Sequence, residues 1–234
     1  MRSLSLFLAV RAGVLLVLVV AGGLALPEAA SAARLGDPAS VAAPTRFTLG
    51  VEYEFLERDV EFDSPFFGAN KTELESQRVL VRGAYGIAPN LEVFARLGGA
   101  EAKTDTPSVN GDFGVAFGGG VKGVIYRGPN WALGAVGQFL YFESENGGDI
   151  KVLEFDLATG ASFALGPVTP YVGVVLQVTE GKLSTAGQSR DFDQDNLLGL
   201  FFGMNYVPQP NISLGIEAHL IHETAVSLVL EARF

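Results

Sequence analysis

Two histidines near the end of the chain offer the residue types and spacing that could do chemistry. Glu217, His219, His222 and Glu223 bring two imidazoles and two carboxylates close together. An imidazole titrates near neutral pH, so an acid–histidine pair can hold and move a proton. The order His-x-x-His-Glu does not match the helical zinc-protease motif. Glu217 and His219 instead share one face of a strand-like segment, where a hydrogen-bonded structural pair is the simpler interpretation.

Two further patterns match known motifs only in part. Residues 118–123 read Gly-Gly-Gly-Val-Lys-Gly, which fits the dinucleotide fingerprint, but that motif works as a strand-to-helix turn and no helix follows here. Close packing or strand curvature explains these glycines better. Residues 191–196 resemble the first half of a calcium loop, but Asn196 replaces the required glycine and Phe202 the bidentate glutamate. We therefore expect no cofactor and no dedicated metal site.

These residues belong to segments in which apolar and polar side chains alternate. Near the end of the chain, Val226, Leu228 and Leu230 alternate with Ser227, Val229 and Glu231. Residues 47–55 show the same two-residue period. Successive side chains of a strand point to opposite faces, so each segment predicts a strand with one apolar face.

The breaks between the alternating segments are of two kinds. Short proline turns lie at 88–90, 128–130, 165–170 and 207–211, and longer polar stretches lie near 57–75, 103–112, 143–149 and 179–193, with a very short one at 222–224. Turns and loops in strict alternation predict ten antiparallel strands with both ends of the series on the tight-turn side. The expected strands are 46–56, 77–87, 91–102, 113–126, 131–142, 151–164, 170–178, 196–206, 212–221 and 225–234. An eight-stranded alternative remains, because the stretch 171–176 of the seventh expected strand is apolar on both faces.

A last strand with one apolar row that ends on Phe234 resembles the closing strand of bacterial outer-membrane β-barrels. In that family the terminal aromatic residue is part of the signal read by the barrel-assembly machinery. The chain is similar to the small porin-like or opacity-type barrels of Gram-negative bacteria. The resemblance implies an all-β, antiparallel, up-and-down transmembrane barrel in the outer membrane, surrounded by lipid and lipopolysaccharide. A soluble sandwich or lipocalin-like barrel is the alternative, in which the apolar faces would compete for one small core.

The N-terminal part predicts export. Arg2 and Arg11 form a positively charged n-region, an apolar run follows at 12–26, and Ala30-Ser31-Ala32 offers a small-residue cleavage site, as in a secretory signal peptide. The predicted organisation is a signal peptide at 1–32, a short flexible periplasmic lead at 33–45 and a barrel at 46–234. The chain has no cysteine. Its net charge is −10, and this negative charge disfavours nucleic acid as a partner.

In a membrane barrel the apolar face meets lipid and the polar face lines the lumen. The residues expected in the lumen are Glu52, Glu54, Arg78, Arg82, Glu92, Arg96, Lys122, Glu154, Asp156, Glu217, His219, Glu231 and Arg233. They either form a salt-bridged plug or line a narrow aqueous path. Bulky inward residues such as Phe94 and Phe201 favour a mostly occluded lumen.

The leading functional hypothesis is therefore a non-enzymatic membrane scaffold with surface-exposed interaction loops. In the first loop, Phe66 and Phe67 lie among acidic residues and form either a partner-binding tip or a group folded back on the rim. The first alternative is a narrow passive channel for small solutes or ions. The second is a rim hydrolase of the omptin kind built on Glu217 and His219, although that family's complementary aspartate pair has no convincing counterpart here.

Overall fold

In the computed structural model, the described residues are 34–105, 108–146, 148–194, 197–221 and 223–234, and the predicted signal peptide lies outside them. Every regular element of this part is a β-strand. The strands are β1 (Phe47–Phe66), β2 (Ala69–Ala88), β3 (Leu91–Asp105), β4 (Ser108–Asn110), β5 (Gly114–Arg127), β6 (Trp131–Glu145), β7 (Asp149–Phe163), β8 (Val168–Thr185), β9 (Gln188–Gln194), β10 (Leu198–Gln209), β11 (Ile212–Leu220) and β12 (Thr224–Arg233). Among the described residues, no helix is both long and apolar enough to span a bilayer.

Ten of these strands close into a barrel. The order of neighbours is β10-β11-β12-β1-β2-β3-β5-β6-β7-β8, and β8 pairs back with β10, all antiparallel. The short strands β4 and β9 stand outside this ring: β4 pairs with β3, while β9 pairs with β8 and β1. The prediction of a ten-stranded up-and-down barrel is thus confirmed for the wall, and the eight-stranded alternative is wrong.

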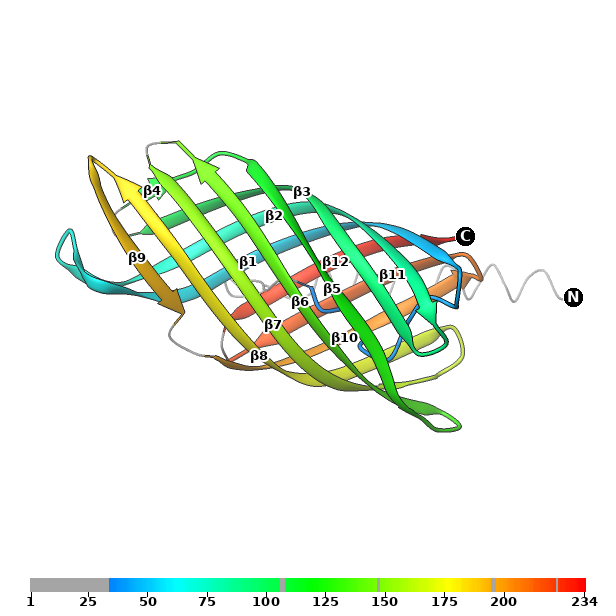
Figure 1. Cartoon of the computed structure of the whole chain (residues 1–234). Helices are drawn as coiled ribbons and strands as arrows, with labels where there is room; N and C mark the ends of the chain where they lie inside the picture. Colours follow the sequence, from blue (N-terminus) through cyan, green and yellow to red (C-terminus); the bar gives the residue numbers. More distant parts are fainter. Residues whose placement is uncertain (1–33, 106–107, 147, 195–196, 222) are drawn as a thin grey trace, which may run out of the picture.

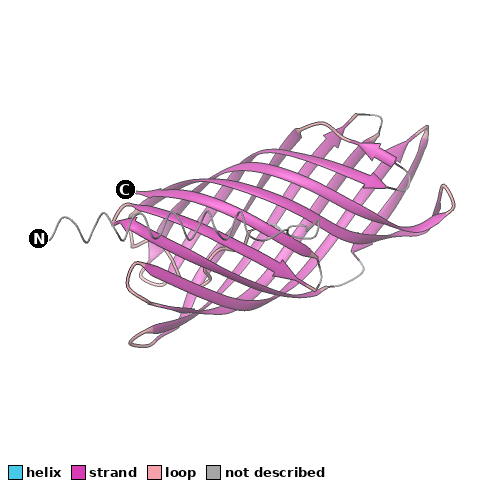
Figure 2. Cartoon of the chain, turned by 180° about the vertical axis from the view of Figure 1, so that it is seen from behind, coloured by secondary structure: helices cyan, strands magenta, loops and turns pink. Residues whose placement is uncertain are grey.

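The two ends of the barrel differ, as Figures 1 and 2 show. At one end, which we call the turn end, short connections join β2 to β3, β5 to β6, β7 to β8 and β10 to β11, and the C-terminus lies there. At the other, the extension end, several strands run well past the rest of the wall. The predicted proline turns all fall at the turn end, because proline cannot donate to a strand ladder and fits a tight connection.

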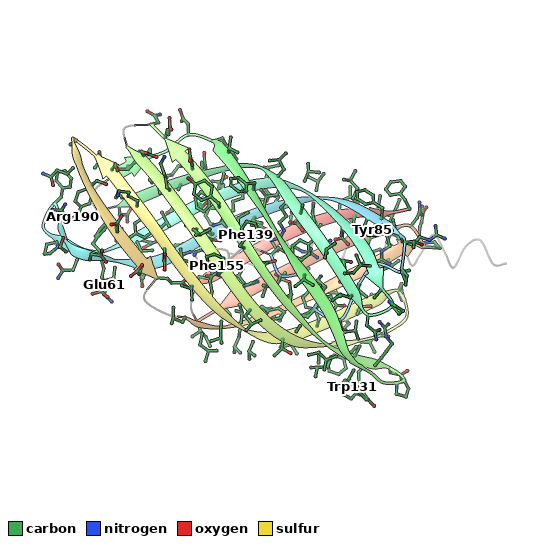
Figure 3. All side chains as sticks on the ribbon, viewed as in Figure 1. Glu61, Tyr85, Trp131, Phe139, Phe155 and Arg190 are labelled. Atoms are coloured by element: carbon green, nitrogen blue, oxygen red, sulfur yellow. The ribbon has the colours of Figure 1, made fainter. Side chains whose placement is uncertain are left out.

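The outer surface of the wall is an apolar belt. Phe139 and Phe155 point away from the barrel in Figure 3, and Phe155 and Leu157 are 51% and 62% exposed. Toward the extension end the outward positions change to charged residues, which begin at Glu57, Glu75, Glu101, Glu143, Lys151 and Glu180. An outward apolar belt with a two-residue period is the architecture of a transmembrane β-barrel of the bacterial outer membrane.

Most residues of the long polar stretches extend the strands beyond the belt, so the prediction of long loops there is wrong. The β1–β2 hairpin runs to Phe66, with the turn at Phe67 and Gly68, and β9 pairs with β1 across Val60, Glu61 and Phe62. Alternation continues here with charges outward and, from Val60 on, apolar side chains inward, and β1 pairs with β2 as far as Glu61, where the register shifts. The high polar content of these segments hid their period.

Candidate functional site

The interior of the barrel is the part of this protein where chemically active side chains gather. Nearest the extension end is a group that we call the upper ionic cluster: Glu54, Arg58, Arg78, Glu154 and Glu223. Arg78 binds both oxygens of Glu154, at 2.9 and 2.6 Å, and lies 3.8 Å from Glu54. Arg58 binds Glu154 at 2.8 Å and Glu223 at 3.0 Å, and so links the two carboxylates. All five side chains are fully buried, so these ion pairs are shielded from solvent.

Closer to the turn end is the lower ionic cluster: Arg34, Glu52, Arg82, Glu92, Arg96 and Glu231. Arg96 and Arg34 both bind Glu52, at 2.9 and 3.3 Å. Arg82 binds Glu92 at 2.5 Å and Glu231 at 3.3 Å, and so links these two carboxylates. Arginine suits this arrangement because its planar guanidinium can serve two carboxylates at once. The ring of Phe94 stacks against the guanidinium of Arg82, whose central carbon is 4.5 Å from the ring centre.

In residues 34–45, which we call the lead segment, 34–39 are buried in the lumen, 40–42 are partly buried and 43–45 are exposed, so the prediction of a flexible tail is wrong for the buried part. The backbone amide of Arg34 donates to Glu54 at 2.9 Å, and that of Leu35 donates to Glu217 at 2.8 Å. Arg34, Leu35 and Asp37 are each at most 3% exposed. A segment without periodicity gives no sequence signal for this placement, because its partners are carboxylates of strands far along the chain.

Two wall glycines make room for the lead segment. A Cβ added at Gly134 would overlap the carbonyl oxygen of Pro38, and one at Gly86 would overlap that of Ala43. Gly86 also exchanges backbone hydrogen bonds with Thr45 and Arg46, at 2.9 and 3.1 Å. The wall and the lead segment therefore fit each other as packed parts of one interior, where an added methyl group would be felt.

The acid–histidine pair lies in the same interior. His219 Nε2 is 2.9 Å from Glu217 and its Nδ1 is 3.6 Å from Glu223. The hydroxyl of Tyr171 donates to the second Glu217 oxygen at 2.9 Å. His219 and Glu217 are only 2% and 1% exposed. The arrangement can share a proton within the lumen, but neither side chain lies on the rim, so the rim position expected for this pair is wrong.

Asp156 is held by neutral partners. The side-chain amides of Gln138 and Gln177 each donate to it at 2.7 Å. Neither glutamine was among the expected lumen residues, although both share the inward parity of their strands.

The structure places the expected lumen residues on the inner face, and all but two are at most 5% exposed. Glu231 is partly buried, while Arg233 is exposed at the turn end, where the wall stops. Phe234, the expected assembly signal, is 63% exposed, and its backbone amide donates to Phe47 at 2.9 Å.

Sequence reasoning missed several interior residues. Arg58 continues the even-numbered inward series of Glu52 and Glu54, so extending the strand past residue 56 would have found it. Glu223 lies at the short break between β11 and β12, and Arg34 and Asp37 lie on the lead segment. None of these three residues belongs to a segment with a two-residue period, so the sequence does not mark them as inward-facing.

The extension end is closed by apolar side chains. The cluster contains Val60, Phe62, Phe66, Leu74, Leu80, Ala100, Ala102, Val109, Ala116, Leu140, Phe142, Ile150, Val152, Leu183 and Phe192. Phe142 lies under Arg78, whose guanidinium carbon is 4.6 Å from the ring centre, so this apolar core begins where the upper ionic cluster ends. A second apolar cluster forms around Leu35 on the turn side.

Outside the belt, charged pairs are exposed. Lys151 lies 3.5 Å from Asp149 and 3.7 Å from Glu143. These carboxylates, Asp149 foremost, raise the pKa of Lys151. Such exposed pairs contribute little stability, because water and salt screen them.

The structure supports the packing interpretation of the glycine motif and places part of the acidic one in a strand. A Cβ at Gly118 or Gly120 would overlap a backbone carbonyl of β6, so these glycines allow close strand packing. Residues 191–194 belong to strand β9 rather than to a loop, while Asp195 and Asn196 lie outside the described residues. No group of three or more histidine or acidic side chains in the described ranges is arranged to hold a metal ion.

The sequence matches no protein-family model and no curated protein. Solved structures similar to the chain include the outer membrane protease OmpT from Escherichia coli, with a TM-score of 0.47 and 9% identity over 83% of this chain and 99% of that one. An outer membrane channel from Pseudomonas putida F1 also gives 0.47, with 12% identity over 87% and 100%. Ail of Yersinia pestis gives 0.38, with 15% identity over 82% and 99%. Likeness this weak assigns neither family nor function, and the barrel assignment rests on the strand pairing.

Proposed function

We propose that the protein is a non-enzymatic, closed outer-membrane barrel that acts as a membrane scaffold and carries a surface-exposed extension. The observation that supports this proposal is the filled interior. The lead segment and the lower ionic cluster fill the turn side, the upper ionic cluster follows, and the apolar core fills the extension end. A solute crossing the barrel would have to displace all three layers.

The orientation of the scaffold follows from its two ends. Outer-membrane barrels have short periplasmic turns and longer external loops. The turn end then faces the periplasm, the belt contacts outer-membrane lipid and lipopolysaccharide, and the extension faces outward. Glu61 and Arg190 mark the extension in Figure 3, and Tyr85 and Trp131 mark the opposite end.

The extension is the part available to a partner. Phe66 is fully buried while Phe67 is 52% exposed at the tip, with ring centres 4.9 Å apart. Of the two sequence interpretations, folding back thus applies to Phe66, and only Phe67 is presented at the surface. Acidic residues such as Asp59, Glu61 and Asp63 surround this hairpin.

The alternatives have less support. In the channel hypothesis Arg82, Arg96 and Lys122 face carboxylates across water, but Arg82 and Arg96 are tied into ion pairs. In the hydrolase hypothesis Glu217 and His219 must reach a substrate, but both are buried beneath the lead segment and the wall.

We expect no discrete conductance steps when the full-length protein is reconstituted in a planar bilayer, because ionic and apolar layers both block the lumen. We also expect none from a variant that lacks residues 34–45, because the apolar core remains. The matched control is a known open porin reconstituted in the same lipid. Stable single-channel steps from the intact protein would favour the channel hypothesis over the scaffold.

Deletion of Phe234 is expected to reduce assembly into the outer membrane, as the resemblance to closing strands implies. The measurement is the amount of heat-modifiable, folded barrel in outer-membrane fractions. Phe47→Leu at the neighbouring strand start controls for the loss of an aromatic residue at this end. An undiminished folded fraction after the deletion would show that Phe234 is not an assembly signal.

A further inference from the structure

Within the part of the chain that the structure describes, Lys122 is a buried cation without a direct partner. It is 5% exposed, and no carboxylate of the described residues comes within 4.0 Å of its ammonium. Glu92 is its cross-strand neighbour and faces the same interior. That carboxylate is already taken, because Arg82 binds one oxygen at 2.5 Å and the Ala42 amide binds the other at 2.6 Å. A buried charge without a partner is costly, so a ligand that neutralises it would be held.

Lys122 faces a small cavity at the turn end. The cavity volume is about 30 Å³, and its lining is mostly polar. A single water needs roughly 10–15 Å³ of such space, so the cavity has room for one small ion. The charged residues that line it are four cations, Arg34, Arg82, Lys122 and Arg233, and three carboxylates, Asp37, Glu92 and Glu231. The lining therefore carries one more cation than carboxylates, and Glu52, which Arg34 also binds from outside the lining, is shared with Arg96.

Two of these cations can contact the same ion. A Cβ built on Gly36 would lie 3.1 Å from Arg34 Nη1 and 3.2 Å from Lys122 Nζ, so these two nitrogens are at most 6.3 Å apart. Gly36 has a φ of +69°, a conformation that disfavours any side chain, so glycine keeps a side chain away from these two nitrogens.

We propose that this cavity binds one small monovalent anion of the size of chloride, held between Lys122 and Arg34 and supplied from the turn end. The anion balances the charge of the lining and joins the lead segment to strand β5. The site is independent of the scaffold function, because a closed barrel can hold the ion with or without a surface partner.

The first test is thermal unfolding of the folded, detergent-solubilised full-length protein, followed by loss of the heat-modifiable band. At equal ionic strength, chloride is expected to raise the Tm by about 2–4 °C over gluconate, because an ion bound only by the folded state stabilises it. Lys122→Met is expected to abolish this difference, and Arg233→Gln, at the exposed edge of the cavity, to reduce it. Lys103→Met, on the outer surface of the extension, is the control and should retain the full response.

The second test locates the ion. Crystals grown in sodium bromide should show an anomalous peak between Lys122 and Arg34 in the wild-type protein. Equal Tm values in chloride and gluconate for the wild type would overturn the proposal. So would a chloride response that both Lys122→Met and Arg233→Gln retain, or bromide peaks only at other positions.

Discussion

Replacement of Arg78 by leucine is expected to destabilise the barrel by about 3–5 kcal/mol, the cost of breaking a buried ion pair from one side. The change leaves Glu154 and Glu54 in the interior without the guanidinium that now lies 2.6 and 3.8 Å from them. Arg58 remains on Oε1 of Glu154, but Oε2 loses the hydrogen bond that Arg78 donates to it at 2.9 Å. The measurement is the free energy of unfolding by urea in detergent micelles.

The double variant Arg78→Leu/Glu154→Leu is the informative comparison. It removes both partners, so it should be less destabilised than Arg78→Leu alone, since an apolar pair can replace a buried ion pair at little cost. Lys182→Gln disrupts an exposed pair with Asp191, at 3.4 Å, and should change the stability by less than about 1 kcal/mol. If Arg78→Leu is no more destabilising than Lys182→Gln, the upper ionic cluster does not hold the interior together.

Gly134→Val is expected to displace the lead segment from the lumen. Its Cβ would overlap the carbonyl of Pro38, and this overpacking costs about 1–3 kcal/mol, which the interior can avoid by releasing the segment. The chain has no cysteine, so Ala39→Cys provides a single reporter thiol. Ala39 is 6% exposed, and maleimide should label the reporter slowly in the parent and roughly tenfold faster or more with Gly134→Val.

Gly137→Val on the same strand is the matched control. Nothing lies within 4 Å of a Cβ built there, so the labelling rate should stay at the parent value. Equal labelling of the Gly134→Val and Gly137→Val proteins would contradict a lead segment packed against β6.

The sequence predicted whether a side chain faces the lumen only where the residue belongs to a strand with a clear two-residue period. The even-numbered inward series that includes Glu52 and Glu54 could be read directly, as could the proline turns, because a strand fixes the side of every second residue. The same rule applied to Arg58 would have extended the first strand past residue 56. This continuation of the strand was hidden by the acidic residues of 57–63, whose polar composition is typical of a loop and which face outward beyond the belt.

The sequence by itself determined the strand period, the tight turns, the antiparallel barrel and the inward face of its charged residues, because these depend on neighbours a few residues apart. Only the tertiary structure decided which cation meets which carboxylate, as between Arg78 and Glu154. It alone placed Arg34 in the lumen and packed Phe142 into the core that closes the far end. Ring closure brings together side chains from strands far apart in the chain, and no local pattern encodes those distances.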